Sequence, residues 1–209
     1  MEKQTTCRQC GTCCRKGGPS FHLEDRAIID DGLIQAKDLF TIRQGEPAHE
    51  NVQGKILPVK TDIIKIKGKK GVWECAFLNG ETHRCAIYAN RPVECRALMC
   101  WDTRKIEAIY NRTRLTRRDL LQNVAGLWNL VEDHQRRCDY RILQCLAGKL
   151  TDGPDRASRK QLLEIVGFDT HIRILTTQQG GIQMALTEFL FGRPLTVTLP
   201  LMGIPIKNL

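Results

Sequence analysis

Four cysteines fall within eight residues near the start of the chain, in the stretch CRQCGTCC at residues 7–14. A CxxC spacing lets two thiolates converge on one metal through a tight turn. The CxxCxxC run of Cys7, Cys10 and Cys13 extends this arrangement, so that three thiolates can cap one metal ion or one cluster. Gly11 supports a tight loop between these ligands. The spacing therefore predicts a metal site at the N-terminal end of the chain.

Cys14 directly follows Cys13, and this adjacency leaves its role open. Because side chains of neighbouring residues usually point apart, we expect that the two thiolates do not share one metal. Cys14 then binds a second metal, bridges two metals or remains a free reactive thiol. The three-cysteine run has a spacing similar to that of bacterial ferredoxins, in which the last cysteine serves another cluster. Structural zinc usually takes two separated CxxC pairs, so the run favours iron–sulfur.

The cellular compartment of the protein influences whether its cysteines form disulfides or bind metals. Ten of the 209 residues are cysteine, which is below the roughly 8–10% that marks a disulfide scaffold. The sequence MEKQTTCRQC at the N-terminus has no apolar region and no small-residue cleavage site, so we predict no secretory signal. We also find no run of about 18 apolar residues that would span a membrane. We therefore expect a cytoplasmic protein, in which clustered cysteines bind metals or perform redox chemistry more often than they form disulfides.

A second set of cysteines lies between residues 75 and 100. Cys75, Cys85 and Cys95 recur every ten residues, and Cys100 follows closely. We expect these thiols to reach the N-terminal loop, so that both sets hold the metal. The candidate metal ligands are Cys7, Cys10, Cys13, Cys14, Cys75, Cys85, Cys95 and Cys100.

Local patterns place the second set on a short β-hairpin and the element after it. Residues 72–78 have the composition of a strand, Asn79-Gly80 is a turn signal, and residues 85–88 read as the return strand. The first two cysteines of the set then lie on the two arms. Pro92 suits the first position of a helix, and this next element carries Cys95.

The stretch CRQCGTCC, followed by CAFLNGETHRCAIYANRPVECR, resembles the CxxCxxCC family of zinc- or iron-chelating proteins (YkgJ-like cysteine-cluster proteins). The match covers roughly the first 100 residues and not residues 103–209. It is specific, because the cysteines and the phrase IYxxRPxxCR must coincide. The resemblance implies a metal-binding cysteine-cluster protein and implies little about a reaction. The matching positions are Cys7, Cys10, Cys13, Cys14, Cys75, Phe77, Leu78, Cys85, Ile87, Tyr88, Arg91, Pro92, Cys95 and Arg96.

Between the two cysteine sets the sequence predicts short elements. Residues 22–31 read as a short helix and residues 33–45 as a second short element, and Ile63, Ile64 and Ile66 indicate a strand. A turn at residues 67–71 leads into the hairpin. His22 and Asp25 follow the N-terminal cysteines closely, and we expect an exposed pair at a helix start rather than partners of the metal ligands.

The second half of the chain is predicted to be mainly helical. Apolar residues at a 3–4 spacing predict one long amphipathic helix over residues 117–147. Cys138, Cys145 and His134 lie on its apolar stripe, so we expect two core cysteines and a core histidine. Further along the chain, residues 159–166 and 183–190 read as helices, whereas Leu195 to Leu199 is strand-like.

These patterns predict an α+β fold. It consists of a small, irregular, metal-bound cysteine-cluster domain with a short hairpin, followed by a mainly helical portion. We assign residues 1–102 to the cysteine-cluster domain and residues 103–150 to a helical extension packed on it. Residues 151–209 begin with the linker-like TDGPDRASRK and form a C-terminal segment without an assigned role.

The chain carries a net charge of +9, concentrated in two stretches. Residues 103–118 hold six basic residues against one acid, and residues 55–70 hold six lysines against Asp62. Such stretches favour an anionic partner, either nucleic acid or an acidic protein, and residues 103–118 are the candidate contact. Solvated basic faces are the simpler interpretation, because Tyr110 is the only aromatic residue in the first stretch.

The sequence therefore predicts a metal protein whose reaction it does not specify. The leading hypothesis is an iron–sulfur cluster, or iron, held by both cysteine sets. The alternative is a structural zinc module that contacts nucleic acid or a protein partner. A thiol-redox or metal-delivery protein, with Cys14 and Cys100 as reactive thiols, ranks third. We find no phosphate-binding loop, dinucleotide fingerprint, HExxH or GxSxG motif, so the sequence does not decide whether the chain is an enzyme.

Overall fold

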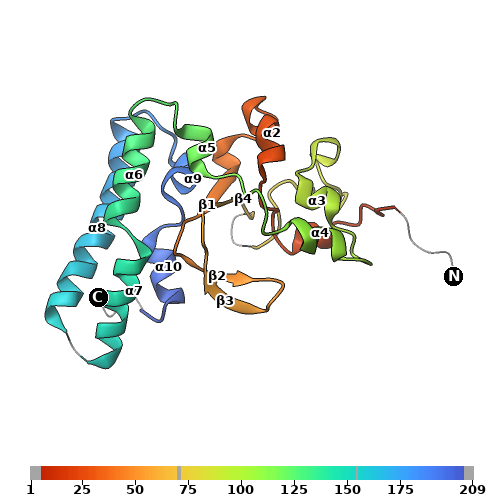
Figure 1. Ribbon diagram of the computed structural model, residues 1–209. Helices are drawn as coiled ribbons and strands as arrows, with labels where there is room; N and C mark the ends of the chain where they lie inside the picture. Colours follow the sequence, from red (N-terminus) through yellow and green to blue (C-terminus); the bar gives the residue numbers. More distant parts are fainter. Residues whose placement is uncertain (1–5, 70–71, 154, 205–209) are drawn as a thin grey trace.

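The computed structural model describes residues 6–69, 72–153 and 155–204 and confirms the α+β class. Figure 1 shows a helical region built from α6, α7, α8 and α10 at one end, the strands in the middle, and α3 and α4 beside the N-terminal segment at the other end. The strands are β1 (Leu39–Ile42), β2 (Pro47–Glu50), β3 (Lys55–Pro58) and β4 (Ile63–Ile66). The 3₁₀ turns are η1 (Leu23–Asp25), η2 (Ala36–Asp38), η3 (Tyr88–Asn90) and η4 (Met184–Leu186). The helices are α1 (Thr12–Arg15), α2 (Arg26–Asp30), α3 (Val93–Ala97), α4 (Arg104–Ile109), α5 (Arg117–Leu121), α6 (Leu127–Arg137), α7 (Tyr140–Asp152), α8 (Arg156–Gln178), α9 (Thr187–Phe191) and α10 (Leu195–Leu201).

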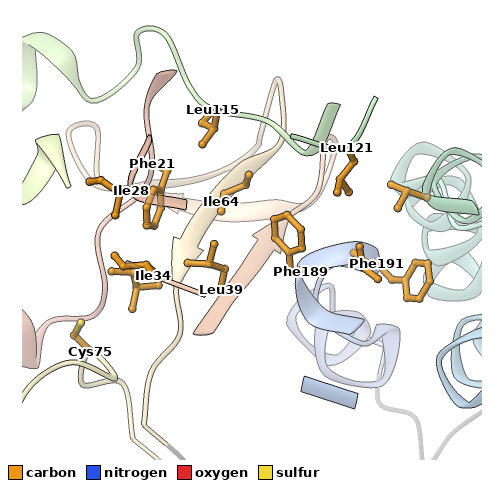
Figure 2. Close-up of a cluster of buried hydrophobic side chains, with 13 residues drawn as sticks. Phe21, Ile28, Ile34, Leu39, Ile64, Cys75, Leu115, Leu121, Phe189 and Phe191 are labelled. Carbon is orange, nitrogen blue, oxygen red and sulfur yellow. The ribbon is translucent and has the colours of Figure 1, made fainter. Parts of the chain in front are cut away.

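The central core is built on the antiparallel pair β1–β4, in which Leu39 lies opposite Ile66. β-branched and aromatic residues in both strands suit a buried, pleated surface, and β4 confirms the strand predicted around Ile63–Ile66. The strand pair packs against side chains that come from distant segments (Figure 2). The fully buried members of this cluster are Phe21, Leu39, Ile64, Leu115 and Phe191.

The C-terminal segment completes this core. Helix α9 packs on β1, and its residues Phe189, Leu190 and Phe191 are buried in the same cluster as β1 and β4 (Figure 2). The hydroxyl of Thr41 donates a hydrogen bond of 2.7 Å to the carbonyl oxygen of Phe189, which fixes the helix to the strand. Residues near the end of the chain are therefore part of the core on which the cysteine-bearing segments rest.

The single helix predicted over residues 117–147 is wrong, because the chain forms α5, α6 and α7 there. Gly126, with φ of 78°, interrupts the chain before α6, and the side chain of Asp139 caps a new helix by accepting a hydrogen bond from the amide of Arg141. Because α7 starts anew after Asp139, its buried face does not continue the apolar stripe predicted for a single helix. Cys138 is fully buried as expected, but Cys145 is exposed.

Two further element predictions are corrected. Residues 195–199 are not a strand, since they form most of α10, which packs on α8. The cysteine hairpin is reduced to one isolated antiparallel bridge between Leu78 and Cys85. The hairpin that does form strand pairs is β2–β3, which the sequence patterns did not predict. Of the predicted turn at residues 67–71, Lys70 and Gly71 lie outside the described residues.

Two buried ionisable side chains connect elements across the core. Arg117 is 2% exposed and forms a bidentate pair with Asp62, with N–O distances of 2.6 and 3.0 Å. It also donates to the carbonyl oxygen of Leu190 at 2.7 Å. His134 is fully buried, as expected of a core histidine, and its Nε2 lies 2.7 Å from Oδ1 of Asp169.

Within the three described ranges, none of the helices combines the length and the apolar character that a membrane span requires.

We predict that His134 makes the stability of the protein depend on pH. Burial lowers the pKa of His134 to about 4 from 6.5, against the effect of its hydrogen bond to Asp169. Because the folded-state pKa is depressed, this contribution is present above pH 6.5 and is lost as the pH falls through 4. The difference corresponds to about 3 kcal/mol in the free energy of unfolding.

Denaturant unfolding of the wild-type protein and of His134→Gln at several pH values between 7 and 4 measures this contribution. The variant should lose about 3 kcal/mol less than the wild type over this interval. His171→Gln is the matched control, because His171 lies on α8 and is exposed. Equal pH dependence in His134→Gln and the wild type would contradict the prediction.

Candidate metal centre

The N-terminal cysteine loop turns sharply at Gly11, which has φ of 72° and is buried. A Cβ at this position would lie 2.7 Å from the carbonyl oxygen of His83 and 2.9 Å from Cδ1 of Leu78. Only glycine therefore fits, for both conformational and steric reasons. The close approach packs the loop, and α1 directly after it, against the segment that carries the second cysteine set.

Backbone hydrogen bonds join the second cysteine set to this loop. The amide of Cys75 donates to the carbonyl oxygen of Cys14 at 2.8 Å, and Cys75 also forms an antiparallel bridge with Gly68. Beyond it, the amide of Ala86 donates to the carbonyl oxygen of Phe77 at 2.8 Å, which holds Cys85 opposite Leu78. The two sets thus meet as the sequence predicted, although without regular strands.

The phrase IYANRPVECR forms a compact turn that leads into α3. Nε of Arg91 donates to the carbonyl oxygen of Tyr88 at 2.8 Å, and the guanidinium lies over the Tyr88 ring, 3.6 Å from its centroid. Pro92 lies directly before α3, one residue ahead of the first helical position expected for it. The helix carries Cys95, and Nη1 of Arg96 donates back to the carbonyl oxygen of Arg91 at 2.8 Å. Arg91 and Arg96 therefore stabilise the conformation of this turn.

Two thiols of the N-terminal run are in direct contact, and Cys85 of the second set lies beside them. The Sγ atoms of Cys13 and Cys14 are 4.0 Å apart, so these adjacent side chains do not point away from each other as expected. Hydrogen bonding with Cys14 lowers the pKa of Cys13 and of Cys85 to about 6, and the nearby Arg91 guanidinium contributes to both shifts. The same interactions raise the pKa of Cys14. The ionisation of the three thiols is therefore linked.

Cys75 and Cys95 border this three-thiol group. Burial raises the pKa of both thiols, and the charges of Cys13 and Cys85 raise it further. These charge effects, together with that of Cys13 on Cys10, place six of the eight candidate ligands within electrostatic range of at least one other. Binding of a cation would reverse the effect and favour their thiolate forms.

The remaining three candidates lie at the edge of this group or outside it. Cys7, Cys10 and Cys100 are exposed. Sγ of Cys7 lies 3.4 Å from the amide of Gln9, and Sγ of Cys10 lies 3.2 Å from the hydroxyl of Thr12 and within the influence of the Cys13 charge. Cys100 follows α3 in a loop. The assignment of all eight cysteines as ligands stays a prediction.

Sequence reasoning missed the buried polar residues beside the site. His22 and Asp25 are 1% and 0% exposed, so the expectation of an exposed pair is wrong. Both residues contact α3. Nε2 of His22 lies 3.3 Å from Oε1 of Glu94, and Asp25 accepts a hydrogen bond of 2.8 Å from the amide of Val93. Glu94 was also missed, although its position next to a cysteine in the RPxxCR phrase is a signal.

Another group of ligating side chains lies in the helical region. His134, Cys138 and Asp169 are buried and place one ligand atom each within 4.8 Å of the others. Oδ1 of Asp169 already accepts from His134 and from the Arg173 guanidinium, and Oδ2 accepts from the amide of Leu195. Because these donors use both oxygens and Arg173 already supplies a positive charge, we assign the group to the core.

Comparison with known families agrees with the geometry of the cysteine sets. Residues 6–115 match the sequence model of the family CxxCxxCC, described as "Putative zinc- or iron-chelating domain". The match covers more than half of the chain, and the protein therefore belongs to this family. Neither the curated proteins nor the solved structures gave a significant match to the chain.

We predict that Cys14 controls the ionisation of its two neighbours in the metal-free protein. Alkylation of Cys13 and Cys85 should fall as the pH drops below about 6, because the reactive thiolates become protonated. Replacing Cys14 by alanine removes the donor, so both midpoints should rise toward the ordinary value of 9.0.

Mass spectrometry of each cysteine after brief iodoacetamide labelling across a pH series measures this effect. Cys145, exposed on α7, serves as the internal control, and its profile should be the same in both proteins. If the midpoints of Cys13 and Cys85 stay in place in Cys14→Ala, Cys14 is not their hydrogen-bond donor.

Proposed function

We propose that the chain is a cytoplasmic metal-binding protein in which the two cysteine sets coordinate an iron–sulfur cluster. The proposal is supported above all by the position of Cys14 next to both Cys13 and Cys85, because it joins the N-terminal run to a thiol of the second set. The reaction that such a cluster would serve is not specified by this contact. Iron or zinc ions are the alternative occupants.

The chemistry of the donors fits a soft metal. Thiolates favour zinc, copper(I) and iron–sulfur clusters over hard cations such as magnesium. The pKa of Cys13 and of Cys85 is lowered to about 6, so both are available as thiolates at neutral pH. Sulfur atoms bound to one tetrahedral metal are roughly 3.8 Å apart, given metal–sulfur bonds of about 2.3 Å, and the 4.0 Å between Cys13 and Cys14 is close to this separation.

The CxxCxxC spacing of the N-terminal run favours a cluster over a single ion, because iron–sulfur proteins use this run of thiolates. A tetrahedral zinc ion and an iron–sulfur cluster each use four protein ligands, and Cys13, Cys14, Cys75, Cys85 and Cys95 alone supply five thiols within electrostatic range. A bound cluster would supply electron-transfer or Lewis-acid chemistry, with a potential set by the surrounding charges and hydrogen bonds. The CxxCxxC spacing adds Cys7 and Cys10 as further donors in this proposal.

The alternative of a zinc module with an anionic partner draws little support from residues 103–118. Arg114 and Arg117 are engaged inside the protein by Glu94 and Asp62, and Arg104 pairs with Asp102. The basic side chains of this stretch that remain exposed are Arg104, which pairs with Asp102 at the surface, Lys105, Arg112 and Arg118. This stretch therefore offers a nucleic acid or an acidic protein less charge than its sequence suggests.

We predict that protein purified without oxygen is brown and contains iron and acid-labile sulfide in matching amounts. Cys85→Ser should lose most of this metal, because it removes the second-set thiol that contacts Cys14. Cys145→Ser should retain it, since Cys145 is exposed on α7 and remote from the site.

Visible absorption, together with assays of iron, zinc and sulfide on the same samples, tests this prediction. A colourless protein with stoichiometric zinc and neither iron nor sulfide would contradict the cluster. Equal metal contents in Cys85→Ser and the wild type would contradict the site.

A further inference from the structure

Two buried carboxylates connect the cysteine-bearing segments to each other. Asp25 follows the N-terminal cysteine loop, and Glu94 lies on α3 directly before Cys95. Asp25 is fully buried and Glu94 is 8% exposed. Buried carboxylates are costly unless they accept several hydrogen bonds, so the partners of both groups indicate what they do.

Glu94 reaches from α3 to the N-terminal segment. Its Oε2 accepts from the amide of Ser20 at 2.7 Å. Its Oε1 accepts from Nη1 of Arg114 at 2.6 Å, and Nε2 of His22 lies 3.3 Å away. Both carboxylate oxygens are therefore occupied, and one of them holds the backbone that follows the cysteine loop.

Asp25 reaches in the opposite direction, from the N-terminal segment to α3. Its Oδ1 accepts from the amide of Val93, the first residue of the helix, at 2.8 Å. Its Oδ2 accepts from the amide of His22 at 3.0 Å. Because Pro92 has no amide proton, the amide of Val93 is the first donor that α3 can offer.

The two carboxylates form a reciprocal pair. Each segment contributes one acidic side chain to a backbone amide of the other, and this arrangement fixes α3 against residues 20–25 in both position and rotation. Cys95 follows Glu94 in α3, and its thiol lies within electrostatic range of Cys13, Cys75 and Cys85. A shift of α3 would therefore move Cys95 away from the other thiols.

We propose that Asp25 and Glu94 are positioning residues that hold Cys95 in place for the metal. This inference rests on the proposed function, because it assumes that the cysteine sets bind metal. In this proposal the two carboxylates hold the thiols close together before the metal binds. Neither carboxylate contacts the metal in this assignment, and hydrogen-bonded supports of this kind typically change metal affinity by about 10- to 100-fold.

The test measures Zn²⁺ binding to the full-length, metal-free protein in competition with a chromophoric chelator, without oxygen. Glu94→Gln and Asp25→Asn keep the size of each side chain and remove a charged acceptor. We expect each to weaken Zn²⁺ binding by about 10- to 100-fold. Glu24→Gln and Asp30→Asn are the matched controls, because both residues are exposed in the same segment, and they should bind as the wild type does.

A second background separates positioning from a general loss of stability. In Cys95→Ser the ligand that the carboxylates position is absent, so adding Glu94→Gln or Asp25→Asn should weaken Zn²⁺ binding by less than about threefold. An equal loss in both backgrounds would show that the carboxylates act on the fold as a whole, and would overturn the proposal. Unchanged binding of the single variants in the wild-type background would overturn it as well.

The wild-type measurement keeps this inference distinct from the proposed function. If the wild-type protein binds Zn²⁺ but the carboxylate variants bind equally well, only the positioning role fails. If the wild type binds neither Zn²⁺ nor an iron–sulfur cluster, the proposed function fails, and the positioning role fails with it. Circular dichroism of each variant monitors folding, and loss of the fold in both Glu94→Gln and Asp25→Asn would assign the carboxylates a structural role instead.

Discussion

The contact of Cys14 with Cys13 and Cys85 is the interaction on which the candidate metal centre depends. Two thiolates 4 Å apart near a protein surface repel each other by about 4 kcal/mol, so Cys13 and Cys14 cannot both ionise without compensation. Hydrogen bonding with Cys14 provides this compensation in the metal-free protein, since it lowers the pKa of Cys13 and of Cys85. A bound cation would replace the thiol proton, and metal binding and proton release are therefore linked at this position.

The centre is continuous with the hydrophobic core. Cys75 is 4% exposed and belongs to the same buried cluster as Phe21 (Figure 2). Cys14 packs against that cluster, and the amide of Cys75 donates to the carbonyl oxygen of Cys14. Movement of the cysteine loop would therefore disturb residues that pack on β4, and a metal bound by Cys75 would act on the core through this residue.

Features set by local sequence were predictable. The strand at β4 follows from its β-branched residues, the start of α3 follows from Pro92, and the short helix before Gly32 follows from its apolar spacing. The cysteine spacing identified the family. The long helix over residues 117–147 failed because an apolar stripe continues across a break. Asp139 caps the start of a new helix. Leu143 and Leu146 are buried in this helix, whereas Cys145 is not.

Features that join distant segments were not predictable from local pattern. Asp25 follows a turn and is polar, so an exposed helix start was the natural expectation, yet its acceptor role depends on an amide 68 residues away. The same holds for Arg117, which looks like part of a basic stretch and is instead paired with Asp62 inside the protein. A charged residue enters a core only when a partner offsets its desolvation, and that partner is invisible in a window of neighbouring residues. The cysteine spacing therefore indicates the chemistry of this protein, whereas the partners of the buried acids and arginines cannot be read from local sequence.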